Sequence, residues 1–296
     1  MRTTTTSIRV ICPAKINLSL GITGIRQDGY HTLCSVMQSI GVFNELGVSI
    51  GAGGGITLTS DDPHLPTDAA NTAYRAALYF REEFGINDGF LIHIIKRVPY
   101  QAGLGSASAD AAGVLYALSR LYCIDPYSPQ IKELAVRVGA DVVFCLVGGT
   151  MLAEGIGELL KPLPPMPPCG ILVVKPREGA STPAIFKAYD QLDPEPCQPD
   201  TDGLIKGLAA GSLPQLAACL GNVLECCVPA KSIAEIKQAM LQTGCLGTAM
   251  TGSGSAVFGI YHSVEDAKKA ALVFDTESCW VKVCAPYGGG VTEATM

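Results

Sequence analysis

One stretch limits the possible folds of this chain more than any other: a run of small residues at 98–112 that leads from an apolar strand into an apolar helix. Gly103 and Gly105 permit backbone conformations closed to other residues, and the small side chains let an anion approach the main-chain N–H groups. The apolar residues that follow recur at helical spacing: Ala111, Val114, Leu115, Leu118 and Leu121. Because a helix begins with unsatisfied N–H groups and a positive dipole end, the stretch predicts a phosphate cradle.

The same stretch matches neither of the two common phosphate motifs. A P-loop needs Gly-Lys-Ser/Thr at its end, and no Lys follows here; a dinucleotide fingerprint needs a third Gly where Ser108 stands. A Gly-rich turn that packs closely against a helix accounts for the same residues. From this stretch alone, both interpretations stay open.

Composition excludes several classes of protein. The 296 residues suffice for one large or two ordinary domains, and we expect two. Apolar residues make up 48% and charged residues 16%, which excludes a disordered chain. The net charge of −6 and the scattered Lys and Arg residues give no basic surface for nucleic acid, although local N–H groups and a few cations can still bind an anionic ligand.

The twelve cysteines favour a reduced compartment rather than a disulfide or zinc framework. Most lie in apolar segments, as small core residues do, and no Cys-x-x-Cys pair occurs. The beginning of the chain lacks the apolar core of a signal peptide, and no apolar stretch reaches the roughly 18 residues of a membrane span. We therefore expect a cytoplasmic protein with no structural zinc and no membrane association; the oligomeric state stays open.

The first polar residues of interest lie on an alternating segment. Apolar residues occupy every second position from Ala14 to Ile22, which predicts a half-buried strand with Lys15 and Asn17 side by side on its open face. An ordinary solvated face is the commoner reason for two such polar residues on a strand. A turn at Asp28-Gly29 follows, and Tyr30 and His31 come directly after it, placed either to hold a flat ring or to pack at a strand start.

The segments before the small-residue stretch alternate between strand and helix signals. Residues 35–42, 46–50 and 56–59 predict a meander of strands. A helical pattern begins after Asn71 and ends at Gly85. Residues 90–97 predict a strand that places Lys96 and Arg97 beside the proposed phosphate site, although cations at a strand border are often simply solvated.

An acid marks the next boundary. A helix over residues 129–138 stops at Gly139, and Asp141 then stands before the apolar run 142–147, which we expect to be a strand. Such an Asp either caps a turn or works in a cleft.

The segment 161–168, rich in proline, is the clearest linker in the chain, so we expect domains over residues 1–160 and 161–296. The second half predicts strands at 170–175 and 280–284, a strand pair around 252–255, and helices. One helix is expected to begin at residue 183, and four more are expected over residues 203–210, 212–227, 231–243 and 264–274. Helices on one face of a mainly antiparallel sheet make this half α+β.

Three motifs, in this order and spacing, resemble the superfamily of galactokinase, homoserine kinase, mevalonate kinase and phosphomevalonate kinase. They are Pro13-Ala14-Lys15-Ile16-Asn17 with Asp28-Gly29-Tyr30-His31, then Pro99 to Ala112, then Met250-Thr251-Gly252-Ser253-Gly254-Ser255. The first motif and Gly139-Ala140-Asp141-Val142 are similar to one family within it, the 4-diphosphocytidyl-2-C-methyl-D-erythritol kinases. The similarity continues through 153–158 and 181–186.

The resemblance implies an α+β fold of two domains, a ribosomal-S5-domain-2-like ATP domain and a ferredoxin-like C-terminal domain, with the active site between them. It implies ATP-dependent phosphorylation of a hydroxyl on a small cytidylylated alcohol, in the non-mevalonate route to isoprenoid precursors. ATP and Mg²⁺ are expected, with the metal ligands unassigned.

The resemblance also implies roles for individual residues. Asp141 would be the base that takes the hydroxyl proton, and Lys15 its partner, since phosphoryl transfer needs a positioned nucleophile and charge stabilisation. The cytidine-bearing substrate would contact Asn17, Tyr30, His31 and Phe186. ATP would be bound by Lys96, Pro99, Tyr100, Gln101, Ala102, Gly103, Leu104, Gly105, Ser106, Ala107, Ser108 and Ala109.

This chain departs from the family pattern at two places. Ser106-Ala107-Ser108-Ala109 stands where Gly-Gly-Ser-Ser is usual, so a hydroxyl is missing at Ala109, and Val143 replaces a usual Pro. Two alternatives therefore stay open: a superfamily kinase for another small alcohol, and a non-catalytic sensor of a nucleotide or metabolite. Intact Lys15 and Asp141 argue against the sensor.

Overall fold

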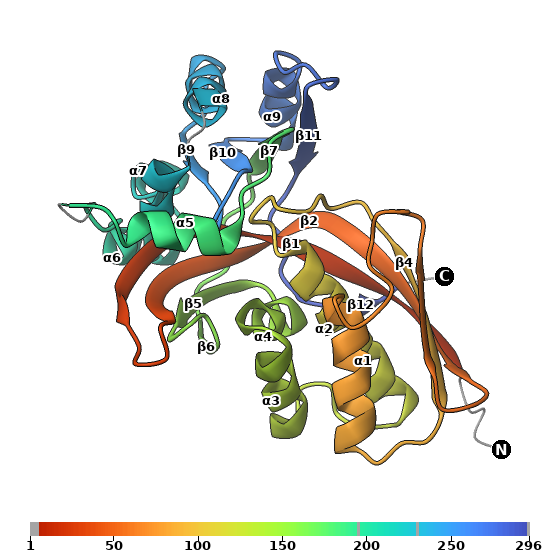
Figure 1. Cartoon of the computed structure of the whole chain (residues 1–296). Helices are drawn as coiled ribbons and strands as arrows, with labels where there is room; N and C mark the ends of the chain where they lie inside the picture. Colours follow the sequence, from red (N-terminus) through yellow and green to blue (C-terminus); the bar gives the residue numbers. More distant parts are fainter. Residues whose placement is uncertain (1–5, 194–195, 229–230, 295–296) are drawn as a thin grey trace.

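Two long antiparallel strands, β1 (Ser7–Ile25) and β2 (His31–Gly51), run through both halves of the molecule (Figure 1). The computed structural model describes residues 6–193, 196–228 and 231–294. The pairing of β1 with β2 shifts register at three places, the first between Pro13 and Ala14, and such shifts bend a strand pair. The bend carries one pair of strands from the first domain to the underside of the second.

The first sheet has the order β12-β1-β2-β4-β3, with β5 and β6 continuing from β2 and β8 lying beside β1. Its other strands are β3 (Ile56–Ser60), β4 (Gly89–Ile95), β5 (Thr150–Glu154), β6 (Leu159–Pro162), β8 (Gly221–Asn222) and β12 (Thr292–Glu293). Most pairings are antiparallel; β3 with β4 and β1 with β8 are parallel.

Four helices lie on one side of this sheet (Figure 1); three of them contact its strands, and the helix over residues 129–138 packs mainly on the other helices. They are α1 (Thr72–Glu83), α2 (Ser106–Leu121), α3 (Pro129–Val138) and α4 (Ala140–Val147). The Asn71 side chain accepts a hydrogen bond from the Ala73 N–H, which caps α1 as the sequence predicts. The core between helices and sheet contains the fully buried rings of Phe80, Phe90 and Phe144.

The second sheet has the order β11-β7-β10-β9 and is antiparallel throughout. Its strands are β7 (Gly170–Pro176), β9 (Gly247–Met250), β10 (Val257–Tyr261) and β11 (Cys279–Cys284). The helices of this half are α5 (Thr182–Tyr189), α6 (Thr201–Ala209), α7 (Leu213–Ala218), the 3-10 helix η1 (Val223–Cys227), α8 (Lys231–Gln242) and α9 (Val264–Ala271). The predicted α+β character of this half is confirmed. The expectation that its helices lie on one face of the sheet is wrong, because α8 and α9 pack on one face and residues of α6 and α7 on the other.

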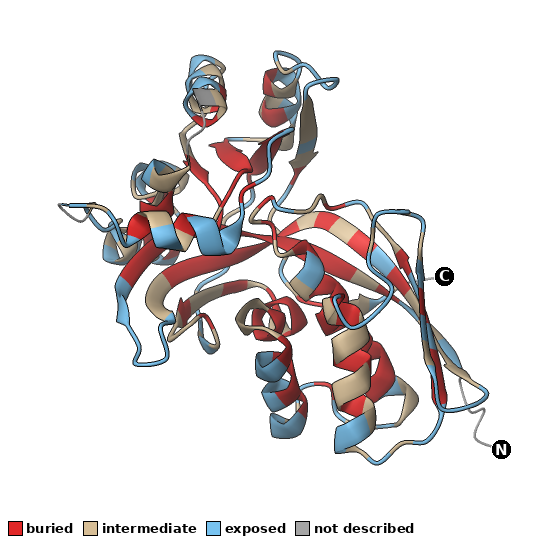
Figure 2. Ribbon diagram, in the orientation of Figure 1, coloured by how far each residue is buried: buried red, intermediate tan, exposed pale blue. Residues whose placement is uncertain are grey.

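Strand β7 shows how the two halves share a core. Leu172 and Val174 face the cluster that includes residues of α8 and α9, whereas Ile171 and Val173 face Ile16 of β1 and residues of α6 and α7. Both faces of this sheet are therefore covered, and buried residues are continuous across the junction of the domains (Figure 2). Residues of both domains that meet at this junction are therefore held in place by one shared apolar core.

Three expectations, for β1, β2 and the segment 212–227, are wrong. The face of β1 that carries Lys15 and Asn17 is not open: the two residues are 4% and 1% exposed, because loops of both domains cover it. Residues 35–50 form one strand, β2, rather than separate strands of a meander. The expected helix 212–227 ends at Ala218, and the chain continues as β8 and η1.

The apolar run after Asp141 is the helix α4, not a strand, and Asp141 lies in its first turn. Val142, Phe144 and Leu146 are all fully buried. A helix that is apolar on every side has no polar stripe, so over a short run its sequence resembles that of a buried strand.

The division of the chain at residues 160 and 161 stays a prediction, but the structure shows which segments cross the junction. Lys161 and Pro162 belong to β6, and the segment 163–169 leads to β7. The end of the chain then returns to the first domain: the Tyr287 N–H donates to the Ser39 carbonyl (2.8 Å), and β12 pairs with β1. No sequence pattern indicated this return.

Among the described residues, no helix is both long and apolar enough to cross a membrane.

Candidate active site

A pocket of about 350 Å³ lies at the junction of the domains. The loop 99–105 forms one wall, and Gly103 (φ 72°) and Gly105 (φ 70°) both adopt left-handed conformations there. Gly105 directly precedes α2, so the beginning of this helix faces the pocket. The predicted phosphate cradle therefore lies where a ligand can reach it, and phosphate binding itself stays a prediction.

Lys15, Asn17 and Asp141, predicted from separate parts of the chain, meet in this pocket. The Lys15 ammonium donates to the Asn17 side-chain oxygen (2.7 Å) and lies 3.4 Å from Asp141 Oδ2. Lys15 is 4% exposed, whereas the Asp141 side chain is 32% exposed. A buried ammonium thus lies beside a carboxylate that a solute can reach.

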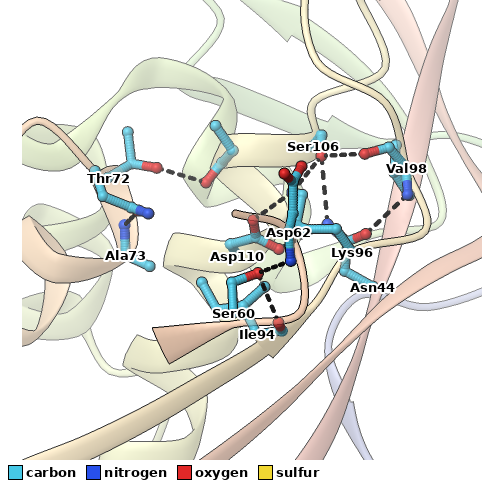
Figure 3. Close-up of polar contacts among 12 residues, drawn as sticks. Asn44, Ser60, Asp62, Thr72, Ala73, Ile94, Lys96, Val98, Ser106 and Asp110 are labelled. Carbon is cyan, nitrogen blue, oxygen red and sulfur yellow. Dashed lines mark hydrogen bonds and ion pairs between the residues drawn. The ribbon is translucent and has the colours of Figure 1, made fainter. Parts of the chain in front are cut away.

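Lys96 is not a free cation. Its ammonium lies 2.6 Å from Asp110 Oδ2 and 2.6 Å from Ser106 Oγ (Figure 3). Asn44 completes the cluster: its amide donates to Asp110 Oδ1 (2.7 Å), and its carbonyl oxygen accepts from the Val98 N–H (2.9 Å). The ammonium is held behind the loop 99–105, which we call the phosphate loop after its predicted role, and joins the end of β4 to the first turn of α2.

Burial raises the pKa of the Asp110 carboxyl, and the Lys96 ammonium opposes that rise. The Lys96 side chain is 6% exposed and Asp110 is 2% exposed, so solvent screens their attraction little. Sequence reasoning missed Asn44 and Asp110. Each is a polar residue within a buried segment, and that contrast was the available signal.

The predicted substrate residues are only partly brought together. Phe186 lines the pocket, and its ring centroid lies 4.9 Å from that of His31. His31 Nε2 lies 2.7 Å from Asp190 Oδ1, which ties the beginning of β2 to the end of α5. Tyr30 is 64% exposed and does not line the pocket. Of these three rings, Phe186 lines the pocket, His31 packs against Phe186 outside the lining, and Tyr30 lies at the surface.

The main-chain approach of the phosphate loop to the second domain depends on Gly103. A Cβ atom at Gly103 would lie 1.9 Å from the Thr251 carbonyl oxygen. We expect Gly103→Ala to weaken ADP binding by about tenfold or more, because both the clash and the left-handed φ displace the loop. Titration calorimetry with ADP measures this effect.

Gly211→Ala is the matched control for that substitution, since Gly211 has a similar φ (63°) but no atom within 4 Å of the added Cβ. It carries the same conformational cost away from the pocket. Equal ADP affinity of Gly103→Ala and the wild type would contradict a role of the loop in nucleotide binding.

A protein from Desulfitobacterium hafniense (strain Y51), named 4-diphosphocytidyl-2-C-methyl-D-erythritol kinase, is 43% identical over 274 residues, which cover 90% of this chain and 91% of the relative. The chain belongs to this kinase family. A second protein of that name, from Caldicellulosiruptor saccharolyticus, is 41% identical over 260 residues, covering 87% of this chain and 89% of its own length. The resemblance stated from the motifs is confirmed.

Two domain families match parts of the kinase chain. The GHMP kinases N terminal domain matches residues 71–149, and the GHMP kinases C terminal domain matches residues 204–277. The first match includes α1, the phosphate loop and Asp141. These matches show an ATP-dependent small-molecule kinase of two α+β domains, as the motifs implied.

Solved structures agree with this assignment. The crystal structure of a 4-(cytidine 5′-diphospho)-2C-methyl-D-erythritol kinase superposes with a TM-score of 0.79 at 33% identity, covering 96% of this kinase and 100% of the other chain. The crystal structure of a homoserine kinase from Cytophaga hutchinsonii superposes with a TM-score of 0.77 at 23% identity, covering 99% of each. The second match shows the shared fold.

The departures from the family pattern leave the backbone regular. Val143, which stands where a Pro is usual, packs into the core within α4. Ser106 is buried; its hydroxyl donates to the Val98 carbonyl (2.9 Å) and is close to the Lys96 ammonium. Ala109 is fully buried, so its position offers the pocket neither a hydroxyl nor an exposed side chain.

Cys145 lies on α4 one turn after Asp141, and we expect it to resist alkylation. Burial, followed by the nearby Asp141 carboxylate, raises the pKa of its thiol far above neutrality. In the native protein at pH 7.5, iodoacetamide should label exposed Cys123 and leave Cys145 unmodified, as measured by peptide mass spectrometry. In protein unfolded in guanidinium, iodoacetamide should label both cysteines. Equal labelling rates in the native protein would show that the contact between α2 and α4 opens.

Proposed function

We propose that this kinase transfers the γ-phosphoryl group of ATP to a hydroxyl of 4-diphosphocytidyl-2-C-methyl-D-erythritol, in isoprenoid precursor synthesis by the non-mevalonate route. The observation that carries the proposal is the pair formed by Lys15 and Asp141, 3.4 Å apart in a pocket whose other wall is the glycine-rich loop. The substrate is inferred from membership of the family, and the catalytic groups are inferred from this pair of residues.

In the proposed step, Asp141 accepts the proton of the substrate hydroxyl as that oxygen bonds to the γ-phosphorus. The bond from the γ-phosphorus to its bridging oxygen breaks, and ADP leaves. Lys15 faces the negative charge of the transferring group. Phosphoryl transfer depends on positioning and charge stabilisation, so an ammonium held by Asn17 and a reachable carboxylate are suited to it.

The nucleotide would be held by the loop 99–109 and the beginning of α2, whose N–H groups suit phosphate oxygens. Lys96, already paired with Asp110, would support this loop rather than add an unpaired charge. The cytidine part would contact Asn17, Tyr30, His31 and Phe186. In this arrangement the rings of His31 and Phe186 offer a stacking surface for a flat base, and Tyr30 lies near enough along the chain to cover it.

Mg²⁺ would enter with ATP. Among the described residues, no group of three or more His, Cys, Asp or Glu side chains could hold a metal by itself. This fits Mg²⁺, which usually binds phosphates with one or two protein groups and several waters. The candidate is Ser108, a pocket residue whose hydroxyl makes no hydrogen bond to the described part of the chain. The ion would neutralise phosphate charge.

A cytoplasmic location belongs to the same proposal. All twelve cysteines are free thiols, which suits a reducing compartment. The proposed partners are ATP and the small cytidylylated alcohol.

A substrate panel tests the proposed function. Purified protein is given ATP and Mg²⁺ with 4-diphosphocytidyl-2-C-methyl-D-erythritol, homoserine, mevalonate or galactose, and ADP release is followed. We expect turnover with the cytidylylated compound alone. Turnover of another alcohol would assign a different superfamily activity. ADP binding without turnover of any compound would indicate a sensor.

A further inference from the structure

Thr251 lies where three segments of the pocket wall meet, and it is fully buried. It follows β9 in the second domain and begins the loop 251–256. On one side of it lies Asn17 of β1, and on the other lies Gly103 of the phosphate loop. These two neighbours belong to the first domain, so one side chain of the second domain contacts both halves of the proposed catalytic apparatus.

The Thr251 hydroxyl is shared among these segments. It accepts the Asn17 N–H (3.0 Å), and it lies 3.3 Å from Asn17 Oδ1 and 3.2 Å from the Gly103 carbonyl oxygen. Both of these oxygens are acceptors for its single proton. The same Asn17 Oδ1 accepts the Lys15 ammonium at 2.7 Å. Two hydrogen bonds, both accepted by Asn17 Oδ1, therefore link the hydroxyl to the lysine.

The rest of the loop is fixed independently of this hydroxyl. The Thr251 N–H donates to the Ala256 carbonyl (3.0 Å), and the Ala256 N–H donates to the Ala102 carbonyl (3.1 Å). Asn222 donates to the Met250 and Gly252 carbonyls (2.9 and 2.8 Å). Removal of the hydroxyl alone should thus leave the loop in place and loosen Asn17, whose side-chain amide still donates to Ser35 Oγ (2.8 Å).

We infer that Thr251 is a positioning residue, which acts through Asn17 to hold the Lys15 ammonium in register with the phosphate loop. The inference rests on the proposed kinase function. Thr251 has no role in the chemistry itself; its hydroxyl fixes the side-chain oxygen that orients the lysine. A small displacement of a charged group from a reacting phosphoryl group has a large effect on rate.

Thr251→Val tests the inference, because it keeps the shape and removes the hydroxyl; Thr251→Ser is the control that keeps it. With ATP, Mg²⁺ and the cytidylylated alcohol, we expect Thr251→Val to lower kcat by about tenfold or more, with a smaller change in the KM for ATP. Thr251→Ser should stay within about threefold of the wild type. Circular dichroism and the Tm check that each variant is folded.

A double-mutant cycle distinguishes positioning through Asn17 from a general loss of packing. In an Asn17→Ala background, Thr251→Val should lower kcat by no more than about twofold further. If Thr251→Val does not fold, Thr251→Ala replaces it in the same cycle. Three results would overturn the inference. They are a wild-type kcat in Thr251→Val, a full additional loss of kcat when Thr251→Val is added to Asn17→Ala, and a loss of kcat in Thr251→Ser equal to that in Thr251→Val. A wild type inactive on the whole panel would instead overturn the proposed function.

Discussion

Asp141→Asn should lower kcat by about 10²- to 10⁴-fold and leave ADP affinity nearly unchanged, because the amide cannot accept the hydroxyl proton. Asn has almost the same size and keeps hydrogen-bonding capacity, so the first turn of α4 should persist. Steady-state kinetics with saturating ATP and cytidylylated alcohol measures kcat, and calorimetry measures ADP binding.

Asp266→Asn is the matched control for this prediction. Asp266 also lies in the first turn of an eight-residue helix, α9, so it loses the same favourable interaction with the helix N-terminus. It lies outside the pocket lining. The control should keep wild-type activity. Full activity of Asp141→Asn would remove Asp141 as the base.

Asp110→Leu should be the most destabilising single substitution of those proposed, lowering the free energy of unfolding by about 3–5 kcal/mol. The change leaves the Lys96 ammonium buried without its counter-charge and removes the acceptor of Asn44. Urea unfolding followed by circular dichroism gives the change.

Two further variants show whether the pairing causes that loss. Lys96→Met combined with Asp110→Leu replaces both charges with apolar groups and should recover a large part of the stability, as replacing a whole buried pair often does. Glu293→Gln breaks the exposed pair with Arg120 and should cost less than about 1 kcal/mol. Equal losses from the exposed and the buried pair would contradict the account of the Lys96 cluster.

The sequence predicted best where local chemistry decides the outcome. Asn71 and Gly85 bound α1 as expected, and the alternation from Ala14 to Ile22 lies within β1. Each of these signals depends on a few neighbouring residues: a capping side chain, a left-handed glycine or a period of two.

The sequence predicted poorly where distant segments decide the outcome. Loops of both domains cover the face of β1 that carries Lys15, and nothing between residues 14 and 22 encodes that cover. Residues 142–146 of α4 are all buried, so this part of its sequence lacks the polar stripe that would distinguish it from a strand. Burial of this kind becomes visible only once the chain is folded.

The candidate site divides in the same way. Family motifs brought Lys15, Asn17 and Asp141 into the prediction, and the structure places them together. Asn44 was missed, and Thr251 was named in a motif without a role of its own. Their contacts are with partners more than fifty residues away, such as Val98 for Asn44 and Asn17 for Thr251.

The central claim is that Lys15 and Asp141 direct the γ-phosphoryl group onto the cytidylylated alcohol. Phosphorus-31 NMR of the reaction tests it most directly, because it identifies the product as well as ADP. The wild type should convert the diphosphocytidyl compound to one new phosphomonoester while ATP becomes ADP. The variants Lys15→Met and Asp141→Asn should bind ADP but form almost no phosphomonoester. Release of inorganic phosphate without a phosphomonoester, or equal product from Asp141→Asn, would contradict the claim.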